Sequence, residues 1–402
     1  MTDALRIGLF TPAWPGHSTP NGIATSVYNL AIGLHEIGHV PVIVPMKCDG
    51  EGPADFPVVP VPDLAQGLWG RLRQRFGGYD AANETFIRRI VQATTHARAQ
   101  HGMSALIMEE SLGWTRHVEA RTGLPVIVAL HGPTALLQQH YRPGDAVPEY
   151  QRYKERLEAE AFAAASALIS PSRHVLEGVA GLADIAGKPQ AVLANSFRAP
   201  EPDPLPAALP ERKILFVGRF DYLKGGDVIF EAMARLVERH PQAQLTFAGP
   251  DHGLDRADGT KQSIHEVIAA LPEATQSRIT YFGPASRDQV AALRAEHAIA
   301  LIASRYENLN YSLLEAMAAG QAIVSTAVGG PSEVLVEEDT ALLVRPADPE
   351  AMAAALGRLL EDAALTERLG GRAVAAVKRD FDPAVIAGRM LDFVRDVVKE
   401  AV

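Results

Sequence analysis

The sequence predicts an α/β protein with two doubly wound parallel sheets, each covered by helices on both faces. Short, continuous apolar runs, typical of strands buried on both faces, alternate along the chain with segments whose apolar residues recur at helical spacing. The chain of 402 residues is long for one hydrophobic core and suits two domains of about 200 residues each. Residues 196–210 contain five prolines, the composition of a linker, so the domain boundary is expected there.

Apolar runs that we interpret as strands occur on both sides of this linker. Helices are predicted between them, including residues 83–100, 150–165 and a final helix that ends near residue 400. This alternation is usual for a doubly wound sheet. The predicted strands are residues 5–11, 40–44, 105–108, 125–130, 167–169 and 192–194 in the first half, and 213–217, 244–248, 278–282, 298–303, 322–325 and 341–344 in the second.

The stretch 305–328 carries the first candidate site. It begins after a predicted strand, continues through a polar turn that contains Glu307, and enters a helix that contains Glu315 and ends at Gly320. The stretch is thus a β–α–β unit. Ligands of β–α–β units bind beyond the carboxyl ends of the strands, where the loop leads into the helix. A carboxylate accepts hydrogen bonds from neighbouring sugar hydroxyls, and the N–H groups around Leu309 to Ser312 suit an anion. The alternative is a buried corner whose acids are merely solvated.

A basic loop elsewhere in the same half favours the ligand site. The predicted strand 213–217 is followed by Gly218-Arg219-Phe220-Asp221-Tyr222-Leu223-Lys224-Gly225-Gly226 and then by a helix. The glycines allow the backbone to approach a phosphate closely, while Arg219 supplies a fork that matches phosphate oxygens and Lys224 a point charge. Because surface turns are often basic, the loop alone would be weak evidence.

These motifs together resemble a known family. The segment G-R-F-x3-K-G, the E-x7-E pair of Glu307 and Glu315, and LLEAMAAG-x-AIV are similar to those of the retaining family-4 glycosyltransferases of the GT-B fold. The similarity covers nearly the whole chain and is strongest from about residue 213 to 345.

The resemblance implies an architecture and a reaction. Residues 1–198 would form a Rossmann-like acceptor-binding domain and residues 199–382 a Rossmann-like nucleotide-sugar-binding domain, facing each other across a central cleft. Residues 383–402 would form a helix that crosses back to the first domain. The implied donor is a UDP- or GDP-sugar, and the acceptor a hydroxyl of a glycan, glycolipid or small glycoside. The sugar would be transferred with retention at the anomeric carbon, and neither a metal nor another cofactor is implied.

Two residues of the first half match the family's site. His131 follows the predicted strand 125–130 and precedes a glycine, which places it at a strand's carboxyl end. In the family a histidine in this position lies beside the transferred sugar, and a purely structural histidine is the alternative. Gly22 falls in the loop that faces the donor diphosphate in the family, but here it follows Asn21 rather than a second glycine, and it could simply open a helix.

The second half shows two departures from the family pattern. Glu307 is followed by Asn308-Leu309-Asn310 where Gly-Phe-Gly is usual, and residues 337–340 replace a common Asp-Gly turn. The first change affects residues expected to contact the sugar, so the identity of the donor stays open. Gly283 follows a strand at the place where the family binds the nucleotide base, mainly through the backbone.

The expected mechanism depends on how these charges are placed. Arg219, Lys224 and the helix start near Asn310 should stabilise the negative charge of the departing nucleoside diphosphate. Glu315 should hold ribose hydroxyls, and Glu307 should hold hydroxyls of the transferred sugar. Because no residue stands out as a dedicated base, we expect the front-face route proposed for the family, in which the leaving phosphate oxygen accepts the acceptor's proton.

Two other functions fit the same motifs. One is a GT-B nucleotide-sugar epimerase, which would release free nucleotide without an acceptor. The other is a non-catalytic sugar-nucleotide-binding protein. The presence of Arg219, Lys224, Glu307 and Glu315 together disfavours the non-catalytic protein, since a retired site would not need all four.

Composition limits the remaining possibilities. The net charge of −10 argues against a nucleic-acid partner, and Cys48, the single cysteine, permits no internal disulfide and is interpreted as a small filler residue. No signal peptide and no membrane-spanning run are recognised, so a cytoplasmic location is expected. The D-x-D pattern at residues 380–382 is attributed to a helix cap before Pro383 rather than to a metal site.

Residues 64–76 form the most amphipathic short stretch, in which Arg71, Arg73 and Arg75 alternate with apolar residues. One hypothesis is peripheral contact with the inner membrane face, since basic amphipathic segments bind anionic interfaces. The favoured alternative is a helix packed on the first domain, because Gly67 and Gly70 weaken any free-standing helix.

Overall fold

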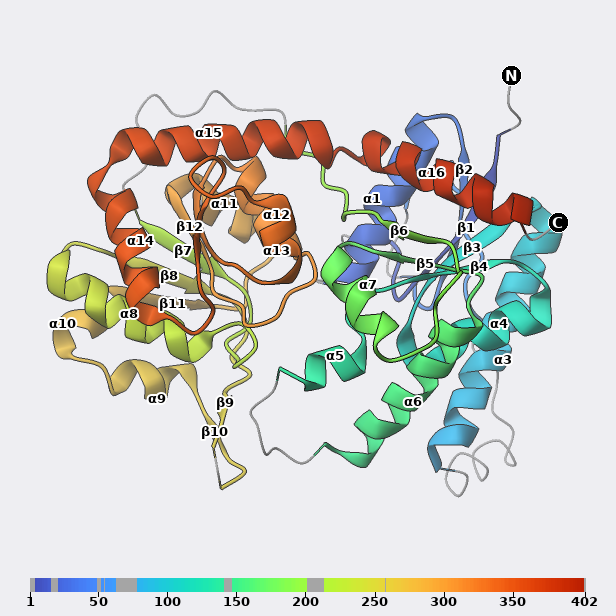
Figure 1. The fold of residues 1–402 in the computed structure, drawn as a ribbon, viewed down its shortest axis with the longest axis horizontal. Coiled ribbons are helices and arrows are strands. Elements are labelled where there is room, and N and C mark those ends of the chain that lie inside the picture. Colours follow the sequence, from blue (N-terminus) through green and yellow to red (C-terminus); the bar gives the residue numbers. More distant parts are fainter. Residues whose placement is uncertain are drawn as a thin grey trace. The chain divides into compact units, whose positions relative to one another are not determined.

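A computed structural model describes residues 4–15, 21–48, 52–53, 55–62, 78–140, 147–200, 213–256 and 258–400. The chain forms two compact units (Figure 1). The first comprises Met1–Ser196 together with Pro383–Val402, and the second comprises Phe197–Asp382. The amphipathic stretch 64–76 lies outside the described residues. Within the described part of the chain, no helix has the length and apolar character needed to cross a bilayer.

The first unit is built on a parallel six-stranded sheet with the strand order β2-β1-β3-β4-β5-β6. Strand β1, next to the edge strand β2, pairs with β2 in the register Leu9 to Ile43 and with β3 in the register Leu9 to Ile107. The strands are β1 (Arg6–Thr11), β2 (Val40–Pro45), β3 (Ala105–Glu109), β4 (Val126–Ala129), β5 (Ala167–Ser170) and β6 (Gln190–Val192). The helices are α1 (Gly22–Glu36), α3 (Gly78–His101), α4 (Trp114–Thr122), α5 (Thr134–Gln138), α6 (Glu149–Ala164), α7 (Arg173–Ala180) and α16 (Pro383–Glu400), with a 3₁₀ turn, η1 (Ser111–Gly113).

Side chains alternate between the two faces of this sheet and so create two apolar cores. Ile7 and Leu9 belong to the core that α1 and α16 complete, whereas Phe10 belongs to the core on the side of α3 and α4. This two-sided burial explains why the strands read as continuous apolar runs. The edge strand β6 is more exposed, and its predicted position, 192–194, was wrong by two residues.

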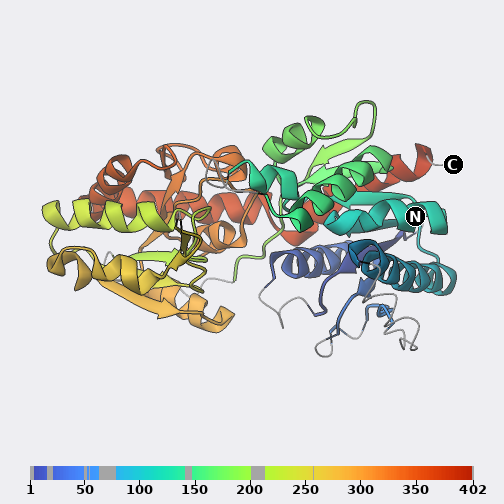
Figure 2. The same ribbon diagram turned by 90° about the horizontal axis from the view of Figure 1, so that it is seen from below.

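The second unit repeats the architecture, with the strand order β11-β8-β7-β12-β13-β14 and all strands parallel. In each unit helices lie on both faces of the sheet (Figure 2). The strands are β7 (Ile214–Val217), β8 (Leu245–Ala248), β11 (Ile279–Gly283), β12 (Ile299–Ile302), β13 (Ala322–Thr326) and β14 (Leu342–Val344), and a separate hairpin pairs β9 (Leu254–Asp255) with β10 (Lys261–Gln262). The helices are α8 (Gly226–Arg239), α9 (Ile264–Ala269), α10 (Glu273–Gln276), α11 (Arg287–Glu296), α12 (Tyr311–Ala318), α13 (Gly329–Val334), α14 (Pro349–Glu361) and α15 (Ala363–Asp380).

Several local predictions can be compared with these elements. Helix α12 ends near Gly320, which adopts the left-handed conformation at φ 70°, as expected for a helix stop. The two aspartates of the D-x-D pattern form ion pairs, Asp380 with Arg379 and Asp382 with Arg198, and α16 begins at the following proline. The interpretation of Cys48 as a filler residue was wrong, because its side chain is exposed just beyond β2.

Helix α16 packs closely on α1, and a glycine makes this contact possible. Ala387 and Met390 of α16 share an apolar core with Leu30 and Leu34 of α1. A Cβ atom on Gly33 of α1 would lie 2.1 Å from the carbonyl oxygen of Pro383, far inside van der Waals contact. The C-terminal helix is therefore held against the first unit by backbone-to-backbone approach as well as by apolar burial.

This contact predicts opposite effects for one substitution at two helical glycines. Gly388→Ala on α16 meets open space and should stabilise the first unit by about 1 kcal/mol through helix propensity. Gly33→Ala should instead destabilise it by roughly 1–3 kcal/mol, because backbone must move to admit the methyl group. Thermal unfolding followed by tryptophan fluorescence reports this unit, since all three tryptophans fall within residues 1–196. A stabilising Gly33→Ala would contradict the packing described.

Candidate active site

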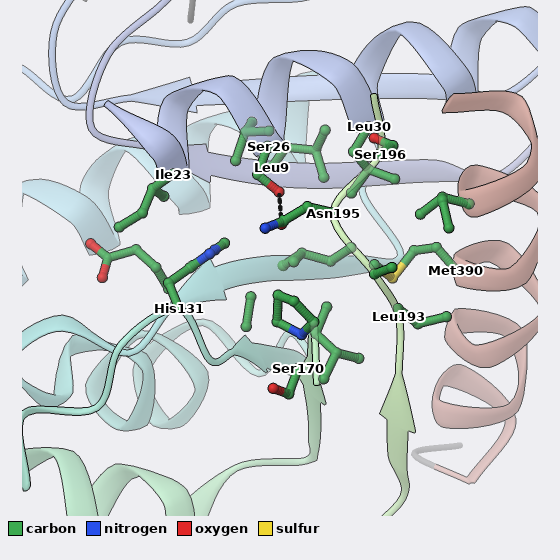
Figure 3. A pocket seen from close by; sticks show the side chains of 18 of the residues that line it. Leu9, Ile23, Ser26, Leu30, His131, Ser170, Leu193, Asn195, Ser196 and Met390 are labelled. Atoms are coloured by element: carbon green, nitrogen blue, oxygen red, sulfur yellow. Dashed lines mark hydrogen bonds between the residues drawn. The ribbon is translucent and has the colours of Figure 1, made fainter. Parts of the chain in front are cut away.

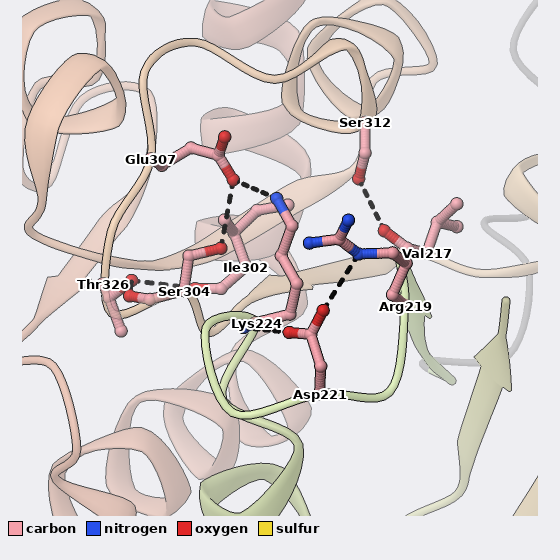
Figure 4. A network of polar contacts seen from close by, with 9 residues as sticks. All are labelled: Val217, Arg219, Asp221, Lys224, Ile302, Ser304, Glu307, Ser312 and Thr326. Carbon is pink, nitrogen blue, oxygen red and sulfur yellow. Dashed lines mark hydrogen bonds and ion pairs between the residues drawn. The ribbon is translucent and has the colours of Figure 1, made fainter. Parts of the chain in front are cut away.

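The predicted donor residues of the second unit gather at the carboxyl edge of its sheet. Strands β7 and β12 are neighbours, so the glycine-rich loop after β7 and the polar loop after β12 start side by side. Figure 4 shows side chains from both loops directed toward one another. This is the position at which parallel α/β sheets bind ligands.

An ion pair joins the two loops. The Nζ of Lys224, from the first loop, contacts Oε2 of Glu307, from the second (Figure 4). Ser304 Oγ donates to the same carboxylate oxygen at 3.2 Å. The side chains of Lys224 and Glu307 are only 21% and 12% exposed, so the pair is partly shielded from water and holds a defined geometry. Sequence analysis proposed both residues for the site but did not foresee that they contact each other.

Asp221 organises the two cations of the glycine-rich loop. One of its carboxylate oxygens accepts a hydrogen bond from the backbone N–H of Lys224 at 2.8 Å, and the other lies 2.9 Å from Nε of Arg219. The Arg219 side chain remains 47% exposed, and its Nε contacts the acid. The remaining guanidinium nitrogens can therefore reach a ligand while the base of the side chain is held.

The start of helix α12 lies next to the same loop. Ser312, in the first turn, donates from Oγ to the carbonyl oxygen of Val217 at 2.9 Å, which fixes the helix start beside the end of β7. Asn310 occupies the N-cap position without capping the helix through its side chain. The backbone N–H groups of this first turn carry the positive end of the helix dipole, so an anion at this edge is favoured.

Close backbone packing fixes the loop that carries Asn308 and Leu309, whose side chains are buried. A Cβ atom on Gly330 would lie 1.6 Å from the carbonyl oxygen of Asn308, and the backbone N–H of Gly330 donates to the carbonyl oxygen of Glu307 at 3.3 Å. Gly225, at φ 74°, approaches the carbonyl oxygen of Ala303 in the same way. A side chain at either glycine would collide with these carbonyl groups, so the close backbone approach of the two loops requires glycine at both positions.

Gly283 lies farther along the edge, at the end of the outer strand β11. It adopts a left-handed conformation at φ 82°, and its carbonyl oxygen accepts a hydrogen bond from Gly249 N at 2.8 Å. A Cβ atom on Gly283 would meet no neighbour within 4 Å, so the space beside it is open. Two strands, β8 and β7, separate it from β12.

Glu315, the second acid of the E-x7-E pair, has a partner that sequence analysis missed. Its Oε2 accepts a hydrogen bond from Nη2 of Arg294 at 3.1 Å. Arg294 belongs to α11 and is 6% exposed, whereas Glu315 is 31% exposed. Burial lowers the pKa of the Arg294 guanidinium, and the nearby Glu315 carboxylate opposes this. In the sequence, nothing distinguishes Arg294 from the other charged residues of its helix.

Arg305, a second arginine that sequence analysis missed, connects the loop after β12 to the glycine-rich loop and the start of α8. Arg305 donates to both carboxylate oxygens of Asp227 at 2.7 Å and to the carbonyl oxygen of Tyr222 at 2.7 Å. Its guanidinium lies 3.9 Å from the centre of the Tyr222 ring. The bidentate ion pair and the cation–π contact hold the glycine-rich loop against the loop after β12.

In the first unit, a buried acid holds the turn that carries His131. Both carboxylate oxygens of Glu110 accept backbone hydrogen bonds, from His131 N at 3.0 Å and from Gly132 N at 2.7 Å. Burial lowers the pKa of His131, and the charge of Glu110 acts in the opposite sense. Beside this turn, Glu158 accepts hydrogen bonds from the N–H and hydroxyl of Thr134 at 2.7 and 2.8 Å.

His131 lines a cavity of about 40 Å³ in the first unit (Figure 3). Ile23 and Ser26 of α1 contribute to its wall, and Ser26 Oγ donates to Oδ1 of Asn195 at 3.1 Å. Gly22 is the first residue of α1, and the preceding Asn21 caps the helix by accepting hydrogen bonds from Ile23 N and Ala24 N. Helix opening, the alternative explanation for Gly22, therefore has a structural basis.

The predicted site residues are thus distributed over both units. Gly22 and His131 belong to the first unit, and the second contains the others: Arg219, Lys224, Gly283, Glu307, Asn308, Leu309, Asn310 and Glu315. Among the described residues, no group of three or more His, Cys, Asp or Glu side chains is arranged to hold a metal ion.

Comparison with known proteins identifies the family. The profile described as "Glycosyl transferases group 1" matches residues 198–375, and the profile described as "Glycosyltransferase Family 4" matches residues 20–196. A D-inositol 3-phosphate glycosyltransferase of Xylanimonas cellulosilytica is 30% identical over 304 residues, which cover 71% of this chain and 69% of the relative. The chain belongs to the family-4 glycosyltransferases.

Other proteins that are similar to this glycosyltransferase in sequence or in fold carry different names. An alpha-D-kanosaminyltransferase of Streptomyces kanamyceticus is 24% identical over 355 residues, covering 85% of this chain and 88% of the relative. A sucrose-phosphate synthase structure from Thermosynechococcus elongatus has a TM-score of 0.72 at 19% identity, covering 98% of this chain and all of that one. An Anabaena protein solved with UDP and glucose has a TM-score of 0.69 at 16% identity, covering 98% of this chain and 100% of that one. The predicted family, enzyme class and GT-B fold are confirmed.

Two buried acids near His131 give this glycosyltransferase a predicted pH dependence. Burial, and after it the charge of Glu110, raise the pKa of Glu109 to about 7 against the opposing effects of Ser111 and Lys154. Burial and the charge of Glu110 likewise raise the pKa of Glu158 to about 7, against the hydrogen bonds of Thr134 and the charge of Lys154. Both groups hold protons more tightly in the folded state than in the unfolded chain.

The stability that these two acids contribute to the first unit should therefore be fully present below their unfolded pKa and be lost as the pH rises through about 7. Urea unfolding followed by tryptophan fluorescence at a series of pH values measures this slope. Glu109→Gln combined with Glu158→Gln should flatten it, whereas Asp392→Asn, at an exposed acid of α16, should not. A slope unchanged in the double variant would refute the assignment.

Proposed function

We propose that this glycosyltransferase moves a sugar from a nucleoside-diphosphate sugar to a hydroxyl acceptor, with retention at the anomeric carbon. The observation that carries the proposal is the contact between Lys224 and Glu307 at the carboxyl edge of the second sheet, with Arg219 on the same loop. A cation suited to phosphate and an acid suited to sugar hydroxyls meet at one point. That combination fits the junction between a sugar and a diphosphate.

In this mechanism the difficult step is departure of the nucleoside diphosphate. Arg219 and Lys224 stabilise the negative charge that develops on the leaving phosphate oxygens, and the first turn of α12 adds the positive end of its dipole. Asp221 holds the two basic residues before the donor arrives. Little reorganisation is then needed when the charge forms, which is the condition under which electrostatic stabilisation is most effective.

The acids bind hydroxyls rather than transfer protons in this mechanism. Glu307, fixed by Lys224 and Ser304, accepts hydrogen bonds from the transferred sugar, and Asn308, Leu309 and Asn310 form the adjoining wall and helix start. Glu315 accepts hydrogen bonds from the ribose. Gly283 lies beside the base, where the open space next to its Cα admits a planar ring.

The acceptor hydroxyl loses its proton to the leaving phosphate oxygen, on the same face from which the diphosphate departs. The bond from the anomeric carbon to that oxygen breaks, the bond to the acceptor oxygen forms, and the configuration is retained. We assign acceptor binding to the first unit, with His131 beside the transferred sugar and the backbone at Gly22 near the donor diphosphate. The Anabaena relative, solved with UDP-glucose in one structure, supports a nucleotide-sugar donor.

Removing either cation should slow turnover strongly while leaving the fold intact. With a sugar nucleotide chosen by calorimetric titration of UDP-, GDP- and ADP-sugars, Arg219→Ala or Lys224→Ala should reduce the rate of donor turnover by roughly 10²–10³-fold. Arg358→Ala, at a half-exposed ion pair on α14, is the matched control and should leave the rate unchanged. Because Arg219 and Lys224 carry the charge stabilisation, EDTA should have no effect.

The competing functions give different results in the same assay. Free nucleotide and an epimerised sugar, released without acceptor, would indicate an epimerase, and a donor that is bound but never consumed would indicate a binding protein. Loss of activity in EDTA with recovery in Mg²⁺ or Mn²⁺ would show that the charge stabilisation assigned to Arg219 and Lys224 is wrong.

A further inference from the structure

We infer that Arg294 is a positioning residue for donor binding: it sets the orientation in which the Glu315 carboxylate meets the ribose hydroxyls. The inference rests on the proposed function, since it concerns how a nucleoside diphosphate is held. Arg294 lies on α11, outside the loops that form the site, and reaches the site through the Glu315 carboxylate and the carbonyl oxygen of Ser312.

The guanidinium of Arg294 donates hydrogen bonds to three residues in and near α12. Its Nη2 donates to the carbonyl oxygen of Ser312 at 2.9 Å and to Oε2 of Glu315 at 3.1 Å. Its Nη1 donates to Oε1 of Gln321 at 2.7 Å. One planar guanidinium thus contacts the helix start, the acid on the helix, and the residue at the beginning of the next strand segment.

Two of the residues that accept these hydrogen bonds, Ser312 and Gln321, are held by hydrogen bonds of their own. Gln321 donates from Nε2 to the carbonyl oxygen of His297 at 2.8 Å, so its amide is oriented with the oxygen toward Arg294. Ser312 is tied through its hydroxyl to Val217, at the end of the strand that leads into the glycine-rich loop. Arg294 therefore links the Glu315 carboxylate to Ser312, and Ser312 is bonded to the end of β7. The loop that carries Arg219 starts from the same strand end.

The burial of Arg294 argues for a functional role rather than for packing alone. The guanidinium is 6% exposed, and its Nε has no hydrogen-bond partner among the described residues. Burying a charge is costly, and an apolar side chain of similar volume often serves stability equally well. Among the described residues, the one acidic partner of this buried arginine is Glu315, which is 31% exposed. The pairing is explained if that carboxylate must be held in one orientation for a ligand.

Arg294 is buried more deeply than Glu315, and this difference decides which of the two residues should be replaced in a test. Removing Glu315 would leave the buried guanidinium without its acid, so Glu315→Ala confounds loss of binding with loss of folding. Removing Arg294 leaves Glu315, which is 31% exposed and can be hydrated. Arg294→Met, which keeps the length and apolar body of the side chain, is therefore the variant of choice.

The test compares a nucleoside diphosphate with its 2′-deoxy form. UDP, GDP and ADP are titrated calorimetrically into the wild-type protein, and the one that binds is compared with dUDP, dGDP or dADP accordingly. A hydrogen bond from a ribose hydroxyl to a charged group should make the ribonucleotide bind about 10-fold or more tightly. In Arg294→Met this ratio should fall to about 3-fold or less, and the KM for the donor should rise about 10-fold with kcat nearly unchanged.

Two further variants separate positioning from general destabilisation. Arg294→Lys keeps the charge but cannot bridge Ser312, Glu315 and Gln321 together, so it should give an intermediate ratio, and it replaces Arg294→Met should that variant not fold. Leu359→Ala opens a cavity in the core of the same unit, on α14, and should lower the melting temperature without changing the ratio.

The outcomes distinguish this inference from the function on which it rests. A wild-type protein that binds none of the three diphosphates would refute the proposed function itself. A wild-type protein that binds one of them with no preference for ribose, or an Arg294→Met protein that keeps the full preference, would overturn the role of Arg294 while leaving the proposed function standing.

Discussion

The ion pair between Lys224 and Glu307 is the interaction on which the candidate site of the second unit depends. It joins the loop that follows β7 to the loop that follows β12, and it does so where the two neighbouring strands end. Parallel strands bring their carboxyl ends to one edge, so residues 83 positions apart in the chain become neighbours. The partial burial of both side chains strengthens their attraction and keeps them in place.

Around this pair the fold supplies rigid supports. Arg305 clamps the glycine-rich loop through Asp227 and Tyr222, and Gly225 and Gly330 allow backbone contacts that no other residue could make. The first unit uses a comparable device with opposite charge, since Glu110 holds the His131 turn through two backbone N–H groups. In both units the side chains assigned to the reaction are positioned by groups that do not take part in it. Such supports reduce the reorganisation needed when charge develops.

Much of the fold could be predicted because burial on both faces leaves a plain signal in the sequence. The run Ala298 to Ala303 could hardly be anything but a buried strand, and β12 occupies its centre. The edge strand β6 gave no such run and was misplaced by two residues, and the two-residue strands of the β9–β10 hairpin are too short to produce any pattern. Cys48 was judged by residue type alone, and its exposure depends on a tertiary position that composition does not reveal.

For the site, the motifs identified residues but not their partners. Glu307, Glu315, Arg219 and Lys224 could be selected because their spacing places them on loops after strands. The link between Lys224 and Glu307, and the pairing of Glu315 with Arg294, are contacts over long sequence separations. No local sequence pattern encodes such contacts. A charged residue on a helix has the same sequence context whether its side chain faces solvent or an acid on another element.

The most direct test of the central claim is a crystal structure of this chain with a bound sugar nucleotide. We expect Nζ of Lys224 to lie within about 3 Å of a phosphate oxygen, with the guanidinium of Arg219 on the same diphosphate and the Glu307 carboxylate on hydroxyls of the sugar. A diphosphate bound elsewhere, with Lys224 and Arg219 directed away from it, would contradict the account.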